Sequence, residues 1–134
     1  MLRFLPKSSN FSQVARFGGK AFPIIKIGNT SVYINANDEG YCKPSNKLGN
    51  TIGDYQSVEV YLHKKGVKSV DFDVRKLSPL PKWSKSFWLS KGTYTPIADV
   101  QAMIDDLEKR EGVEAATLTN EETIASRSEE NKFI

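Results

Sequence analysis

The strongest pattern in the chain is a period-two alternation of apolar and polar residues between positions 57 and 75. Its apolar members are Val58, Val60 and Leu62 in a first run and Val70, Phe72 and Val74 in a second. Such alternation is typical of a strand with one face on the core and the other toward water. Because Lys64-Lys65-Gly66 separates the runs, the pattern predicts an antiparallel hairpin that buries one face.

Shorter patterns add to this predicted sheet. The runs Ile24–Ile27 and Val32–Ile34 flank Gly28-Asn29-Thr30, which predicts another hairpin. Two prolines between Leu77 and Pro81 are expected to end the sheet there, because proline cannot donate to a ladder. Residues 86–90 fit a short strand or an edge.

One helix is predicted, at about residues 96–111. Thr95 is a candidate N-cap, and Pro96 fits the first helical position. Gly112 is a plausible C-terminal stop. A single apolar stripe runs along this segment, formed by Ile97, Val100, Met103, Ile104 and Leu107.

Together these patterns predict an α+β fold. We expect a small antiparallel sheet or partly open barrel of four or five strands with two hairpins, followed by one main helix and a polar C-terminal tail. The expected domain spans residues 1–112, with an N-terminal arm at 1–21. Residues 113–134 form an acidic tail that we expect to be mobile, in which Thr119-Asn120-Glu121-Glu122 could begin a weak second helix. A barrel of the oligonucleotide-binding type is compatible with this expectation.

Charge is divided unevenly along the chain. Residues 1–104 hold 15 Lys/Arg and 7 Asp/Glu, a net charge of +8, whereas residues 105–134 hold 4 and 9, a net charge of −5. A basic body can bind a polyanion while an acidic tail competes for the same surface. The single cysteine, Cys42, excludes an internal disulfide and favours a reducing compartment. Apolar runs are too short for a membrane span, so we expect a cytoplasmic protein with no membrane partner, in the host cytoplasm if a phage encodes it.

Residues suited to catalysis are few. His63 is the only histidine and Cys42 is the only cysteine in the sequence, so a Cys–His catalytic pair would need both. We expect the two residues at surface or edge positions instead. The carboxylates that could gather around a metal ion are Asp54, Glu59, Asp71 and Asp73. Alternation, however, points Asp71 and Asp73 into solvent. We therefore predict a protein that is not an enzyme and has no cofactor and no metal.

The segment from residue 75 to residue 94 mixes cations with aromatic rings and contains both tryptophans. Cations can follow phosphates while rings stack on unpaired bases, so this mixture suits single-stranded nucleic acid. The candidate nucleic-acid-binding residues are Arg75, Lys76, Lys82, Trp83, Lys85, Phe87, Trp88, Lys91 and Tyr94. The competing interpretation is that Phe87, Leu89 and one tryptophan belong to the core, and that the lysines keep a sheet edge soluble.

The last fourteen residues, Glu121–Ile134, read EETIASRSEENKFI and end in Phe133 and Ile134. This segment resembles the acidic tails of bacterial and phage single-stranded DNA-binding proteins, which end in a hydrophobic tip that recruits partners. The resemblance implies partner binding at Phe133 and Ile134. Arg127 and Lys132 depart from it, because they dilute the negative charge. The alternative is a tail that packs on its own body.

Two functions therefore remain. The first is a nucleic-acid-binding accessory protein that favours single-stranded DNA and fits a phage origin, with a tail that competes for the basic surface or recruits partners. The second is a protein-interaction module, such as a phage-type inhibitor, adaptor or virion component, that presents the same aromatic and basic surface to a protein partner. A homo-oligomer is compatible with either. Salt separates them, because phosphate-driven binding weakens steeply as salt rises.

Overall fold

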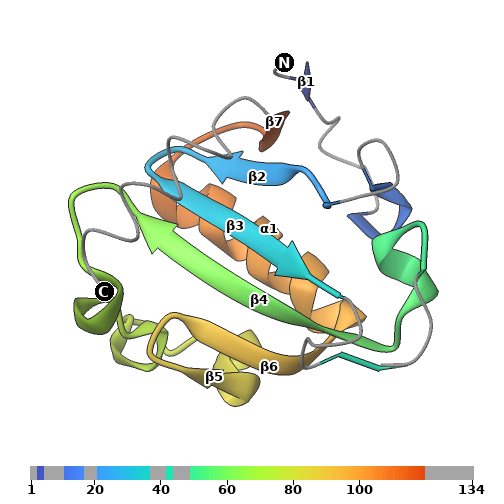
Figure 1. Cartoon of the computed structure of the whole chain (residues 1–134). Helices are drawn as coiled ribbons and strands as arrows, with labels where there is room; N and C mark the ends of the chain where they lie inside the picture. The colour runs from blue at the N-terminus through green and yellow to red at the C-terminus, as the bar shows by residue number, and fades with distance from the viewer. Residues whose placement is uncertain (1–2, 5–10, 17–20, 37–41, 44–48, 120–134) are drawn as a thin grey trace.

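The computed structural model describes residues 3–4, 11–16, 21–36, 42–43 and 49–119. An antiparallel sheet of seven strands runs in the order β1-β7-β2-β3-β4-β6-β5. The strands are β1 (Arg3–Phe4), β2 (Ile24–Ile27), β3 (Thr30–Asn35), β4 (Ser57–Lys64), β5 (Phe87–Trp88), β6 (Lys91–Pro96) and β7 (Thr117–Thr119). Helix α1 (Ile97–Glu111) lies behind the sheet in the view of Figure 1. The predicted α+β class is confirmed, and within the described residues the sheet is open.

The core lies between α1 and the face of the sheet that it covers, here called the inner face. Alternate residues of the central strands reach this face, and all are buried: Ile25, Ile27, Val32, Ile34, Val60 and Leu62. The helix contributes the stripe that its sequence predicted, with Val100, Met103, Ile104 and Leu107 also buried. The alternate residues of the strands and the apolar stripe of the helix therefore pack together in one apolar layer.

The first predicted hairpin is confirmed as β2–β3. Ile25 pairs with Val32 and Ile27 pairs with Thr30, so the chain reverses at Gly28 and Asn29. Gly28 has a φ of 58°, a left-handed conformation that glycine adopts without steric cost. The carboxylate of Glu111, at the end of α1, accepts a hydrogen bond of 2.8 Å from the backbone N–H of Asn29 and thereby ties the turn to the helix.

The ends of α1 agree with the sequence at the C-terminus and differ at the N-terminus. Gly112 is the C-cap with a φ of 68°, and its N–H bonds the carbonyls of Glu108 and Lys109. The N-cap is Pro96, one residue later than the predicted Thr95. Thr95 is fully buried in β6, where its hydroxyl lies 2.9 Å from that of Ser86. Its side chain thus contacts Ser86 and does not cap the helix.

The second predicted hairpin is wrong in its second half. Strand β4 is present, but its neighbours are β3 and β6. Residues 69–76 instead form two 3₁₀ turns, η4 (Ser69–Asp71) and η5 (Val74–Lys76). Asp73 caps η5 by accepting a 3.0 Å hydrogen bond from the N–H of Arg75, a local bond that competes with strand pairing. Val70 is 61% exposed, while Phe72 and Val74 are buried. The alternating pattern therefore came from two core residues at 3₁₀ turns and not from a strand.

Strand β7 lies where the sequence analysis expected a tail. Its three residues pair with β1 on one side and with β2 on the other, and Leu118 faces both Arg3 and Ile25. Thr119, proposed as a helix start, ends this strand. A Thr-Leu-Thr triplet is too short to show a period, so its place in the sheet depends on distant partners. Residues 120–134 lie outside the described part of the chain.

The segment before β2 is anchored by the core rather than by regular structure. Phe11 and Val14 are buried, and the N–H of Phe11 donates a 2.8 Å hydrogen bond to Oε1 of Gln101 on α1. The guanidinium of Arg16 lies 4.3 Å from the ring centroid of Phe22 and donates a 2.6 Å hydrogen bond to the carbonyl of Gly49. These described parts of the expected N-terminal arm are therefore packed on the domain.

Candidate nucleic-acid interface

Two of the nine predicted nucleic-acid-binding residues belong to the core. Trp83 and Phe87 are each 3% exposed, and their rings meet edge to face with centroids 5.3 Å apart. A buried ring cannot stack on a base without leaving its packing site. The burial of Trp83 and Phe87 thus removes them from the candidate surface and matches the competing interpretation for these two residues, whereas Leu89, which it also placed in the core, is half-buried.

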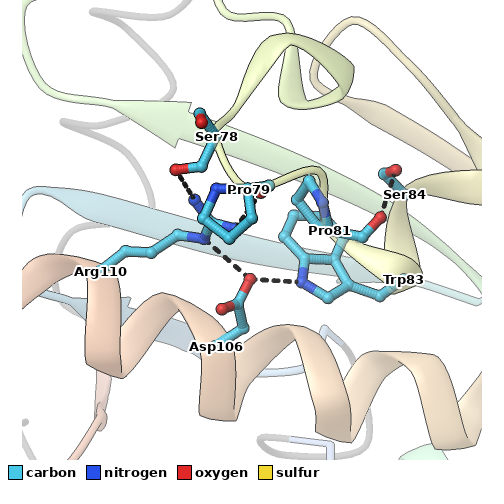
Figure 2. Close-up of polar contacts among 7 residues, drawn as sticks. All are labelled: Ser78, Pro79, Pro81, Trp83, Ser84, Asp106 and Arg110. Atoms are coloured by element: carbon cyan, nitrogen blue, oxygen red, sulfur yellow. Dashed lines mark hydrogen bonds and ion pairs between the residues drawn. The ribbon is translucent and has the colours of Figure 1, made fainter.

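A hydrogen-bond network explains the position of Trp83. The indole Nε1–H donates to Oδ2 of Asp106 at 2.9 Å, and Nε of Arg110 donates to the same oxygen at 2.9 Å (Figure 2). The guanidinium of Arg110 also donates to the carbonyls of Ser78, at 3.3 Å, and Pro79, at 2.6 Å. The 3₁₀ helix η6 (Lys82–Ser86) and the loop before it are therefore fastened to α1.

The remaining predicted residues are exposed or half-buried, and all but Lys91 and Tyr94, which lie on β6, are on or next to the edge strand β5. Trp88 on β5 is 75% exposed, the highest value among the large apolar side chains of the described residues. The exposed cations next to this strand are Arg75 and Lys76 on η5 and Lys82 and Lys85 on η6. Because η5 contacts β5 and η6 leads directly into it, the turns that carry these charges lie next to the strand that carries Trp88.

From this edge, aromatic and cationic side chains cross the face of the sheet opposite α1, here called the outer face. Trp88 pairs with Lys91, Lys91 pairs with Tyr61, and Tyr61 pairs with Tyr33. Directly opposed residues of antiparallel strands share a face, so these four form one row over β5, β6, β4 and β3. The Lys91 ammonium lies 5.3 Å from the ring centroid of Tyr61, within cation–π range. The two tyrosines were not singled out from the sequence, although they occupy the polar positions of their strands.

A buried carboxylate borders the row. Glu59 is 3% exposed, and its Oε1 accepts a 2.9 Å hydrogen bond from Nδ2 of Asn35 on β3. Its Oε2 lies 3.8 Å from the ammonium of Lys91, whose side chain is 39% exposed. The carboxylate therefore holds the lysine over the outer face, where an ammonium can meet both an aromatic ring and a phosphate.

The outer face is more buried than the sequence predicted. We expected β4 to be half-buried with His63 at a surface or edge position, but β4 is an interior strand and His63 is only 7% exposed. Ser31, which pairs with His63, is 3% exposed, and Ile24 on β2 is also 3% exposed. The outer face is thus shielded from solvent at these three positions, whereas Tyr33, Tyr61 and Lys91 remain half-buried.

Tyr94 adds a second aromatic group near this face. It lies where the pairing of β4 with β6 is irregular, and its φ of 50° is unusual for a residue other than glycine. The side chain is 45% exposed, and its ring centroid lies 5.7 Å from the ammonium of Lys43. Lys43 in turn bridges to Ser57 at the start of β4, which places this ring and cation at the other end of that strand.

The described residues give little material for other chemistry. They contain no group of three His, Cys, Asp or Glu side chains placed to bind a metal ion. Cys42 is fully buried, so the surface or edge position predicted for it is wrong. Among the helices described, none is both long and apolar enough to cross a bilayer. The predicted partner-binding residues Phe133 and Ile134 lie outside the described residues.

Comparison with protein-family models, with curated proteins and with solved structures finds no match for this chain.

Proposed function

We propose that this chain is a non-catalytic accessory protein that binds single-stranded nucleic acid, and single-stranded DNA in particular, in the cytoplasm. The observation that carries the proposal is the row formed by Trp88, Lys91, Tyr61 and Tyr33 across the outer face. Aromatic side chains on an open sheet offer flat surfaces to unpaired bases, and stacking on such a ring contributes about 1–3 kcal/mol per base.

Charge supports the same proposal. Residues 64–91 contain eight Lys/Arg and two Asp, a net charge of +6. Four of these cations stand exposed on short turns beside Trp88, where a phosphate backbone can pass before its bases reach the row. Duplex DNA keeps its bases stacked and paired, so the aromatic row favours a single strand. In this proposal the acidic residues beyond Thr119 compete for the basic surface or recruit a partner through Phe133 and Ile134.

One observation favours a second candidate, a protein-interaction module. An indole that is 75% exposed at a sheet edge beside arginine and lysine resembles the anchors of protein interfaces, which are rich in Trp, Tyr and Arg. A protein partner would cover Trp88 through apolar contact. Such binding would depend weakly on salt, in contrast to phosphate-driven binding.

Titration of labelled oligo-dT and of a matched duplex at low and moderate salt tests the proposal. We expect oligo-dT to bind more tightly than the duplex, to quench the fluorescence of Trp88, and to lose affinity steeply as salt rises. The variant Trp88→Ala should weaken oligo-dT binding by about 5–150-fold, the equivalent of one stacked base.

Leu80→Ala provides the matched control, because Leu80 is an apolar residue 64% exposed that lies outside the aromatic row. This variant should bind oligo-dT like the unmodified chain. Thermal unfolding of both variants should remain unchanged, which would separate a binding effect from a folding effect. Absence of oligo-dT binding at low salt, or equal binding by Trp88→Ala, would refute the proposal and leave the protein-interaction module.

A further inference from the structure

We propose that Tyr94 and Lys43 form a second base-binding position on the outer face, next to a first position at Tyr61 and Lys91. The two positions hold neighbouring bases of a strand apart, so the protein prefers a strand that unstacks easily, such as oligo-dT, over oligo-dA. This inference rests on the proposed function, because it concerns the same surface. It goes beyond that function by naming the class of base that the surface selects.

An extra residue in β6 turns Tyr94 toward the outer face. On β4, the buried inner-face residues Val58 and Val60 are separated by one residue, Glu59. Their partners on β6 are separated by two residues, the second of which is Tyr94. This is a β-bulge, in which two residues of one strand stand opposite one residue of the other and a side chain is re-aimed. Tyr94 therefore lies opposite Glu59 and not in the core.

The contact between Tyr94 and Lys43 shows which face they share. Lys43 pairs with Ser57 of β4, and its N–H donates a 3.0 Å hydrogen bond to the carbonyl of Ser57. Because β6 pairs with the other side of Ser57, Lys43 and Tyr94 lie on opposite sides of β4. Their side chains meet across this strand, with 5.7 Å between the ammonium and the ring centroid. Both residues are exposed, so the contact lies on the outer face.

The outer face over β4 thus carries two similar pairs of an aromatic ring and a cation. One pair is Tyr61 with Lys91, at 5.3 Å, and the other is Tyr94 with Lys43. Glu59 lies between the pairs, two residues from Tyr61 and opposite the bulge. Its carboxylate repels a phosphate from the middle of this patch, whereas the two ammonium groups attract phosphates at its sides. A strand that passes the two lysines brings one base to each ring.

The spacing of the two rings decides what kind of strand fits. Two residues of a β-strand span about 7 Å, so the position of Tyr61 and the position opposite Glu59 are about 7 Å apart along β4. Stacked bases follow each other at about 3.4 Å. Neighbouring bases must therefore separate to reach both rings. Adenines stack on each other more strongly than thymines, so stacking strength gives the surface a preference for pyrimidines.

The backbone at Tyr94 supports a role in binding. Its φ of 50° is a left-handed conformation, which is unfavourable for a residue with a bulky side chain and which glycine adopts without strain. Burial does not offset this strain, because the ring is 45% exposed. Strained residues are concentrated at ligand-binding sites. Contact with a base gives a reason for an aromatic ring at this position.

Removal of the ring tests the second position. Tyr94→Gly should weaken oligo-dT binding by about 5–150-fold, the equivalent of one stacked base. Tyr94→Asn also removes the ring and tolerates the left-handed conformation, so it should bind as weakly. Thermal unfolding of both variants should stay close to that of the unmodified chain. Tyr94→Phe keeps the ring and should bind normally. Normal binding by the two variants without the ring, or loss of binding in Tyr94→Phe, would overturn the proposal.

A comparison of bases tests the predicted preference. The unmodified chain should bind oligo-dT several-fold more tightly than oligo-dA of the same length. In Tyr94→Gly this ratio should fall, because neighbouring bases no longer need to separate. Equal or tighter binding of oligo-dA by the unmodified chain would overturn the proposal, and so would a preference that Tyr94→Gly leaves unchanged.

The charge of Lys43 is tested against a cation on the other side of the sheet. Lys43→Gln should weaken oligo-dT binding at low salt and make the slope of log K against log salt shallower by about 0.7, since one phosphate contact is lost. Lys109→Gln removes the same charge at an exposed position on α1 and should leave this slope unchanged. Equal slopes for the two variants would overturn the role of Lys43 in the second position.

Trp88→Ala separates this inference from the proposed function. If oligo-dT binds and Trp88→Ala weakens its binding while Tyr94→Gly does not, the proposed function stands and the second position is refuted. If the unmodified chain does not bind oligo-dT at low salt, the proposed function is refuted, and the second position is refuted with it.

Discussion

Replacement of Trp83 by phenylalanine isolates the network that fastens η6 to α1. The change removes the indole N–H that donates to Asp106 at 2.9 Å and keeps an aromatic ring against Phe87. A hydrogen bond to a charged group contributes about 1.5–3 kcal/mol. The Asp106 side chain is 31% exposed and keeps its bond to Arg110, so we take the lower end of that range, about 1.5 kcal/mol.

The smaller ring adds a packing cost. Trp83 is 3% exposed, so the lost ring atoms leave a cavity that costs about 1 kcal/mol more. We therefore expect Trp83→Phe to lower the free energy of unfolding by about 2–3 kcal/mol. Urea denaturation followed by circular dichroism measures this quantity, and an unchanged m-value would show that the compactness of the unfolded chain is unaltered.

Two comparisons make this prediction refutable. Trp88→Phe alters a ring that is 75% exposed and should change stability by less than about 0.5 kcal/mol. A double-mutant cycle of Trp83→Phe with Asp106→Ala should give a coupling energy of about 1 kcal/mol, since both changes remove the same bond. A Trp83→Phe protein as stable as the parent, or a coupling energy of zero, would refute the role of this hydrogen bond.

Two further predictions concern side-chain burial and backbone conformation. Phe72→Ala should cost about 3–5 kcal/mol in urea denaturation, because Phe72 is 8% exposed and packed in the core; unchanged stability would contradict its burial. Gly112→Ala meets no atom within 4 Å but must keep a φ of 68°, so it should cost about 1–2 kcal/mol. Gly92→Ala places Cβ 2.5 Å from the hydroxyl of Thr95 and 2.9 Å from Phe87, so it should be the more destabilising glycine variant by thermal unfolding, and the reverse order would contradict this account.

Local patterns predicted the elements that depend on neighbours in sequence. The β2–β3 hairpin follows from Gly28 and its flanking isoleucines, and α1 follows from its apolar stripe and from Gly112. Local patterns failed where contacts with residues far away in the sequence decide the structure of a segment. Phe72 and Val74 alternate like strand residues, but β6 occupies the edge of β4 that they would need. Strand β7 has three residues, which is too few to show a period, and its pairing with β1 and β2 fixes its place in the sheet.

The candidate interface could be predicted only in part, because some of its residues are neighbours in sequence and others are brought together by the sheet. The exposed cations and Trp88 lie within one short stretch of sequence, so the composition of that stretch indicated them as candidate binding residues. Composition could not show that Trp83 is buried, since its partner Asp106 is 23 residues away. Nor could it join Tyr33 to Tyr61 and Lys91, because only the register of β3, β4 and β6 brings these residues into one row.

The position of β7 between β1 and β2 also affects how the protein is made. Ile25 pairs with Leu118, so the edge of β2 stays open until residue 118 has left the ribosome. Synthesis at about 5–20 residues per second leaves that edge exposed for several seconds. An unpaired strand edge is a template for association with other chains. Ribosome-bound chains that stop before residue 117 should therefore engage chaperones, and those that include β7 and clear the exit tunnel should not.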